Sequence, residues 1–150
     1  MRLTVLDSLR GLCAVLVALT HLNAVSHITE SGFVRGSWLF VDFFFVLSGF
    51  VIALVYRDRL SDRAELVAFV IRRFGRLWPL HVSVLLLFVG LEAFKWLIRS
   101  AGLPTHAAPF IGSYEPAALG PNLLLVQALG FFPYHGWNTP SWSISVEFYT

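Results

Sequence analysis

Two ionisable side chains, Arg10 and His21, lie eleven residues apart in a stretch otherwise rich in Leu, Val and Ala. On an α-helix, eleven steps of about 100° end about 20° past three full turns, so both side chains share one face, about 16 Å apart. An ionisable group at membrane depth costs several kcal/mol unless it has a partner or faces a wet cavity. The pair therefore indicates either a functional site or two side chains satisfied by neighbouring helices and the membrane interface.

Two acidic residues have similarly apolar surroundings. Asp42 is the one charged residue in the run 38–56, and Glu147 lies in the aromatic and apolar run 142–149. Each again requires a partner or a wet cavity. The residues themselves leave open whether these acids act in a site or only in packing.

A cluster of guanidinium groups, from Arg72, Arg73 and Arg76, comes just before Trp78. Positions 72 and 76 are one helical turn apart, so their side chains project together. Planar, permanently charged guanidinium groups bind phosphate oxygens in a bidentate manner. The cluster is typical either of a phosphate site or of a cationic helix flank that contacts lipid headgroups.

The elements that must position these residues are membrane helices. The chain is 57% hydrophobic and 13% charged, with 14 Phe and 5 Trp, a composition outside the range of soluble domains. A net charge of +2 is too small to indicate a nucleic-acid partner. We therefore predict an all-α, polytopic bundle of transmembrane helices.

Apolar runs of about 20 residues give the expected spans. The spans are residues 9–25, 38–56 and 78–98, with a surface helix at 64–77 before the last of them. The shorter run 122–132 is interpreted as a tilted, re-entrant or thin fourth helix. Thr139 followed by Pro140 predicts an N-cap and a proline at the first position of a further helix.

The distribution of arginine predicts the orientation of these helices. The connector 57–76 holds six arginines, whereas the connector between the first two spans holds only Arg35. Cytoplasmic loops carry an excess of Lys and Arg, so the connector 57–76 and the amino terminus should both be cytoplasmic. We expect a multi-pass protein of the cell's inner membrane.

Several other kinds of site lack sequence support. No grouping of His, Cys, Asp and Glu has the spacing of metal ligands, and no nucleophile elbow or phosphate-binding glycine loop is present. His81 and Glu92 repeat the eleven-residue spacing. Glu92, however, lies three residues before Lys95 near a helix end, and a boundary ion pair is the simpler interpretation.

Four motifs in a fixed order resemble the acyltransferase-3 family of membrane acyltransferases. They are LDSLRG (6–11) with His21, DFFFVLSGF (42–50), RRFGRLWP (72–79) and WSISVE (142–147). The resemblance implies transfer of an acyl group, often acetyl, from acyl-coenzyme A to hydroxyls of envelope glycans such as lipopolysaccharide O-antigen, exopolysaccharide or peptidoglycan. It also implies a fold of roughly ten helices of about 20 residues each. Residues 1–150 are then expected to be the amino-terminal part of one acyltransferase domain, with about four to five helices and no activity alone.

The resemblance also implies roles for individual residues. His21 matches the catalytic histidine of the first helix, and Arg10 is its motif partner. The cofactor-binding arginine motif matches Arg72, Arg73 and Arg76. Glu147 matches the acid of the Trp-Ser-x-Ser-Val-Glu motif, although Phe148 and Tyr149 follow directly where many members insert two residues.

Residue chemistry and resemblance together give a hypothesis for the mechanism. A neutral His21, buried near Arg10, takes the proton from an acceptor hydroxyl that attacks the thioester, or relays the acyl group itself. The arginines hold the phosphates of coenzyme A, while Asp42 and Glu147 orient the imidazole or balance the arginines.

The expected partners are acyl-coenzyme A, an envelope glycan or lipid-linked saccharide, and membrane lipids. No permanently bound cofactor, metal or nucleic acid is expected. The alternative function is a transporter or channel whose buried Arg, His and Glu line a proton or solute path. Neither an inverted repeat nor a pair of broken helices supports that alternative.

Overall fold

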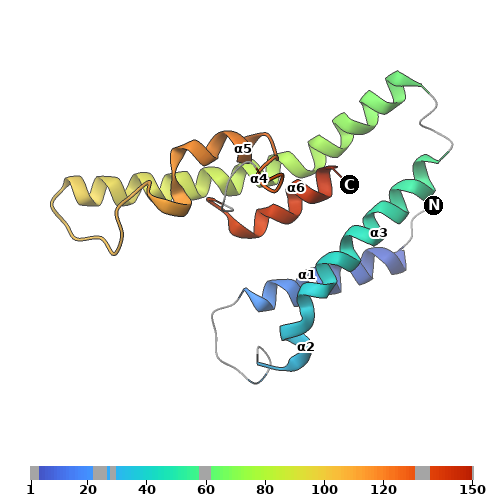
Figure 1. Ribbon diagram of the computed structural model, residues 1–150, viewed down its shortest axis with the longest axis horizontal. Helices are drawn as coiled ribbons and strands as arrows, with labels where there is room; N and C mark the ends of the chain where they lie inside the picture. The colour runs from blue at the N-terminus through green and yellow to red at the C-terminus, as the bar shows by residue number, and fades with distance from the viewer. Residues whose placement is uncertain (1–3, 22–26, 28–29, 58–61, 131–135, 150) are drawn as a thin grey trace. The chain divides into compact units, whose positions relative to one another are not determined.

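The computed structural model describes every residue except 1–3, 22–26, 28–29, 58–61, 131–135 and 150. All secondary structure in these described residues is helical, which confirms the predicted class. The chain forms two compact units, Met1–Ser61 and Asp62–Thr150. Each unit positions two of the four sequence motifs, so each is described by itself (Figure 1).

The first unit is built on a pair of crossing helices, α1 (Thr4–Thr20) and α3 (Leu39–Tyr56) (Figure 1). A short helix, α2 (Gly32–Arg35), and a 3₁₀ turn, η1 (Gly36–Trp38), lead into α3. The Oγ of Ser31 accepts the backbone N–H of Val34 at 3.3 Å and caps α2. The predicted second span, 38–56, agrees with α3 to within one residue.

The predicted first span, 9–25, is wrong at its carboxyl end. Helix α1 stops at Thr20, and His21 lies in the following turn. Its backbone N–H donates to Ala18 O at 3.1 Å, and its ring bonds to Val17 O at 2.9 Å. These bonds satisfy carbonyl groups that a helix end leaves without main-chain partners. Of the predicted span, residues 22–25 lie outside the described part of the chain.

The second unit is organised by one long helix, α4 (Arg63–Ser100). Asp62 caps it, since its carboxylate accepts the N–H of Ala64 at 3.0 Å. The predicted division into a surface helix, 64–77, and a span, 78–98, is wrong, because α4 continues through Pro79 without a break. A proline removes a single main-chain hydrogen bond, and a helix in apolar surroundings tolerates that loss. At about 1.5 Å per residue, α4 is about 57 Å long, almost twice the thickness of a bilayer core.

The chain after α4 turns back and packs along it through short elements (Figure 1). These elements are η2 (Gly112–Tyr114), η3 (Pro116–Ala118), α5 (Leu119–Leu123), η4 (Thr139–Ser141) and α6 (Trp142–Tyr149). A continuous tilted or thin helix over 122–132 is wrong for the described residues, whereas the re-entrant interpretation stays a prediction. Helix α5 ends at Leu123, and Leu125 and Gly130 have φ values of 57° and 79°, which a right-handed helix cannot include.

The helix predicted to open at Thr139 and Pro140 is present, although it begins as the 3₁₀ turn η4 before α6. The residue at the N-cap position is Asn138, so the prediction of Thr139 as the cap is wrong. A buried cluster of Leu85, Ala118 and Trp137 holds the returning chain against α4.

Two helices in the described residues are long and apolar enough to cross a membrane, namely α3 and α4. The apolar stretch of α1 is shorter than these. The all-helical class is therefore confirmed, whereas a bundle of four to five spans is not.

Candidate active site

Arg10 has partners on the second apolar helix of its unit. Its Nη2 donates to the Oγ of Ser48 at 3.3 Å, and its guanidinium carbon lies 4.8 Å from the ring centroid of Phe44. Ser48 is 5% exposed, and Arg10 is half-buried. The contact therefore joins the first motif to the second. Sequence reasoning required a partner for Arg10 but did not identify these two, although positions 44 and 48 are one helical turn apart.

His21 lies one residue beyond the end of α1, and its side chain is exposed. The predicted buried position is therefore wrong within this unit. The Nδ1 atom lies 2.9 Å from the carbonyl oxygen of Val17. A carbonyl can only accept a hydrogen bond, so in the neutral ring Nδ1 carries the hydrogen and Nε2 carries the lone pair. This is the arrangement that a histidine base needs.

Asp42 lies in the first turn of α3 and is exposed. A carboxylate near a helix amino terminus is favoured by the helix dipole, by about 0.3–1 kcal/mol at a surface position. Asp42 lies in an apolar helix as predicted, but within this unit its side chain is exposed and is not buried in a cavity.

The arginine motif meets the fourth motif in the second unit. Arg73 donates from Nη2 to the backbone carbonyl of Glu147, and its guanidinium carbon lies 6.0 Å from the ring centroid of Phe69. Next to this contact, the rings of Phe74 and Phe148 meet edge to face at 6.0 Å. One partner of Arg73 is thus a main-chain oxygen. The contact also places Glu147 at the arginine-rich end of α4.

Arg72 and Arg76 are both exposed on α4, one turn apart. This is the spacing that predicted a pair of guanidinium groups projecting together. Arg73 between them is half-buried, so the three arginines do not share one environment.

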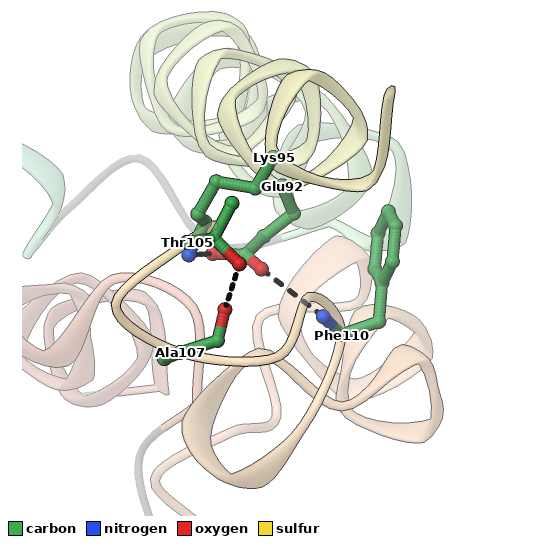
Figure 2. A network of polar contacts seen from close by, with 5 residues as sticks. All are labelled: Glu92, Lys95, Thr105, Ala107 and Phe110. Atoms are coloured by element: carbon green, nitrogen blue, oxygen red, sulfur yellow. Dashed lines mark hydrogen bonds and ion pairs between the residues drawn. The ribbon is translucent and has the colours of Figure 1, made fainter. Parts of the chain in front are cut away.

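The second unit also buries polar side chains that sequence reasoning set aside. His81 and Glu92, on one face of α4, are 1% and 2% exposed. Glu92 pairs with Lys95, which confirms the predicted ion pair, and also accepts the backbone N–H of Phe110 at 3.0 Å (Figure 2). His81 Nε2 bonds to the carbonyl oxygen of Asn122 at 2.9 Å. Their eleven-residue spacing was the available signal.

The WSISVE motif contributes a buried serine that sequence reasoning did not identify. Ser145 is fully buried, and its Oγ donates to the carbonyl oxygen of Leu125 at 2.5 Å. The same Oγ lies 3.3 Å from the backbone N–H of Ala128 and accepts from it. Ser145 therefore anchors α6 to the non-helical backbone that follows α5.

Comparison with known proteins decides the family. The model of the acyltransferase-3 family, described as an acyltransferase domain, matches residues 3–150. The chain belongs to the acyltransferase-3 family. The match covers all four motifs, so the contacts between Arg10 and Ser48 and between Arg73 and Glu147 join motif residues of one acyltransferase-3 domain.

Two relatives show how much of such a protein the chain represents. "Acyltransferase MdmB" of Streptomyces mycarofaciens is 35% identical over 161 residues, which cover 98% of this chain and 37% of the relative. "Protein 2 in picA locus" of Rhizobium radiobacter is 34% identical over 136 residues, covering 88% of this chain and 65% of the relative. The chain thus spans less than two thirds of the length of either relative. No solved structure matches the chain.

Proposed function

We propose that this member of the acyltransferase-3 family acts as a membrane-bound O-acyltransferase. The donor is acyl-coenzyme A, with acetyl as the simplest acyl group, and the acceptor is a hydroxyl of an envelope glycan or lipid-linked saccharide. Family membership and a relative named as an acyltransferase support the reaction class. The two helices of membrane-spanning length, α3 and α4, support the membrane location.

The observation that carries the proposal is the ring geometry of His21. Because Nδ1 donates to the carbonyl of Val17, the neutral ring presents Nε2 as a proton acceptor. In the proposed reaction Nε2 takes the proton of the acceptor hydroxyl while the hydroxyl oxygen attacks the thioester carbonyl carbon. The carbon–sulfur bond then breaks, and the leaving thiolate takes the proton from His21. The products are an O-acyl ester and free coenzyme A.

Arg10 supports this chemistry from inside the helix pair. Its contacts with Ser48 and Phe44 hold α1 against α3, and α1 carries His21 at its end. In the proposed enzyme Arg10 therefore fixes the position of the base. Asp42 and Glu147 are proposed to orient the imidazole or to balance the arginines.

The donor is proposed to bind at the arginine-rich end of α4. Coenzyme A carries several phosphate charges, and the exposed Arg72 and Arg76 offer two guanidinium groups one turn apart. By the positive-inside rule this end is cytoplasmic, together with the connector 57–76 and the amino terminus. Because Arg73 contacts the Glu147 carbonyl, Glu147 belongs to the same side.

The O-acyl content of envelope glycans, measured by mass spectrometry, tests the proposal. Cells carry the complete gene as wild type, His21→Ala or His27→Ala, with matched protein levels. His27 is an exposed histidine six residues further along the chain and serves as the control. We expect His21→Ala to lower O-acylation by about 100-fold or more, the contribution of a general base, and His27→Ala to leave it unchanged. Equal acylation in all three strains would contradict the role of His21.

A further inference from the structure

The backbone that follows α5 needs partners that a continuous helix would otherwise supply. Residues 124–128, which we call the unwound segment, are not helical, and Leu125 within them has a φ of 57°. That value lies in the left-handed region and ends a right-handed helix. Buried main-chain N–H and C=O groups must still be paired. The unwound segment therefore depends on side chains from the elements packed against it.

Three hydroxyl side chains, spaced four residues apart, lie along the side of η4 and α6 that meets the unwound segment. They are Ser141, Ser145 and Tyr149, which we call the hydroxyl stripe. Ser141 and Ser145 are 2% and 0% exposed. Positions four apart share one face of a helix, so the stripe marks a single face of this part of the chain.

Ser145 makes two bonds to the unwound segment. Its Oγ donates to the carbonyl oxygen of Leu125 at 2.5 Å and accepts the backbone N–H of Ala128 at 3.3 Å. A hydroxyl has one hydrogen to donate and lone pairs that accept, so Ser145 uses both functions. An alanine at this position could make neither bond.

The two ends of the hydroxyl stripe bond to the same segment. Gln127, which is 4% exposed, donates from Nε2 to the carbonyl and hydroxyl oxygens of Ser141 at 3.0 and 3.3 Å. The hydroxyl of Tyr149 donates to the carbonyl oxygen of Leu124 at 3.5 Å. Contacts at three successive levels fix the rotation of α6 about its own axis, which a single contact would not do.

The rotation of α6 sets the direction of Glu147. This residue follows Ser145 by two positions, or about 200° around the helix axis. Its half-buried side chain therefore leaves α6 on the side away from the unwound segment. Because side chain and backbone turn together, any rotation of α6 is passed on to the Glu147 carboxylate.

A second serine of the same motif, Ser143, provides a matched comparison. It is half-buried, and its Oγ donates to the carbonyl oxygen of Pro140, three residues earlier in the chain, at 2.9 Å. A bond to the preceding turn does not fix a helix against its neighbour. Ser143 and Ser145 thus share residue type and motif, but they differ in what they hold.

We propose that Ser145 is a positioning residue for Glu147. Through the hydroxyl stripe it sets the rotation of α6 and thereby the direction of the Glu147 carboxylate. The inference rests on the proposed function, because it takes Glu147 as part of the site of acyl transfer. The packing of α6 on the unwound segment does not depend on that function.

Steady-state kinetics of acyl transfer test the effect on Glu147. The full-length protein in nanodiscs receives acetyl-coenzyme A and an envelope glycan fraction, and free coenzyme A is measured. We expect Ser145→Ala to lower kcat by about tenfold or more, because a misplacement of about 1 Å can cost about 100-fold. Ser143→Ala should stay within about twofold of wild type. In a Glu147→Gln background Ser145→Ala should lower kcat by less than about twofold, since the group that it positions is gone.

Cross-linking between α4 and α6 tests the packing without acyl transfer. The rings of Phe74 and Phe148 meet at 6.0 Å, so cysteines at both positions report the rotation of α6. They are introduced into the full-length protein with its native cysteines replaced by serine, and a short bifunctional thiol reagent joins them. We expect Ser145→Ala to slow joining severalfold and Ser143→Ala to leave it unchanged. Tyr149→Phe, at the exposed end of the stripe, should slow it less and provides the test if Ser145→Ala does not fold.

Two results would overturn the proposal. One is joining at the wild-type rate in both Ser145→Ala and Tyr149→Phe. The other is an equal fall in kcat on Ser145→Ala with and without Glu147→Gln, which would assign the effect to general packing. If the wild type releases no coenzyme A, or if Glu147→Gln has no effect, the catalytic part fails together with the proposed role of Glu147. The cross-linking rates then still decide whether Ser145 fixes α6.

Discussion

Of the first pair spaced eleven residues apart, His21 lies at the surface of the first unit, whereas both members of the second such pair, His81 and Glu92, are buried in the second unit. His21 and Asp42 are exposed, and Arg10 is half-buried. His81 and Glu92 are 1% and 2% exposed. Both units contain an ionisable pair eleven residues apart, and in the described part of the second unit a returning chain covers both members of the pair.

This difference distinguishes polar groups that stabilise the fold from polar groups that are available for catalysis. The buried pair bonds to main-chain atoms of the returning chain, His81 to Asn122 O and Glu92 to the Phe110 N–H. Such groups hold the fold together, since a buried polar atom must be satisfied. His21 instead bonds to the turn beside it, which fixes its tautomer while its ring stays accessible. Accessibility with a fixed tautomer is the property that a catalytic base requires.

The largest stability effect should come from the buried pair. Glu92→Ala removes the partner of Lys95 and the acceptor for Phe110 (Figure 2). Leaving the Phe110 N–H without its acceptor costs about 1–3 kcal/mol, and loss of the ion pair with Lys95, whose side chain is 33% exposed, adds up to about 1 kcal/mol. We expect that loss in denaturant unfolding of the full-length protein in detergent. Glu65→Ala, at an exposed position in the first turn of α4, is the control, and an equal loss of unfolding free energy in both variants would contradict a stabilising role for the buried Glu92.

A smaller effect is expected from the half-buried arginine of the first unit. Arg10→Met keeps an unbranched apolar side chain but loses the bond to Ser48 and the contact with Phe44. A hydrogen bond from a charged donor contributes about 1.5–3 kcal/mol, so we expect a loss near the middle of that range. A double-mutant cycle with Ser48→Ala isolates the pair. Additive losses in the cycle would show that Arg10 and Ser48 do not interact.

The smallest effect concerns a single bond at the start of the buried face. Trp78→Phe removes the indole N–H that donates to Leu123 O at 2.9 Å, and it keeps an aromatic ring against Phe74. The net loss should be about 1 kcal/mol in the same unfolding assay. Trp96→Phe, at an exposed site on α4, should cost less. A larger loss of unfolding free energy for Trp96→Phe than for Trp78→Phe would contradict a stabilising role for the bond between Trp78 and Leu123.

Hydropathy alone predicted the helical class and the bounds of α3 almost completely. It missed the continuity of α4, because Pro79 and the arginines before it resemble a helix boundary. A proline removes one main-chain bond and crowds the preceding turn, but α4 continues through it. It also placed the first helix at 9–25, five residues later than the observed Thr4–Thr20, and it allowed a helix over 122–132 where α5 ends at Leu123. There the local bonds of His21 and the left-handed backbone of Leu125 end the helices in stretches that remain apolar.

The sequence also identified residues that need partners but not the partners themselves. The requirement for a partner follows from charge in apolar surroundings. The identity of that partner depends on which helix packs alongside, so Ser48 for Arg10 and the Glu147 carbonyl for Arg73 could not be read from local spacing. The proposed roles of Asp42 and Glu147 in catalysis stay predictions for the same reason.

The most direct test of the proposed role of His21 is the rate of thiol release from acetyl-coenzyme A. The full-length protein in nanodiscs is mixed with acetyl-coenzyme A and an envelope glycan fraction, and free coenzyme A and O-acetyl ester are quantified together. We predict that wild type and His27→Ala each form the two products in equal amounts, and that His21→Ala forms them at a rate lower by about 100-fold or more. A His21→Ala rate within about twofold of wild type would contradict general-base catalysis by this residue.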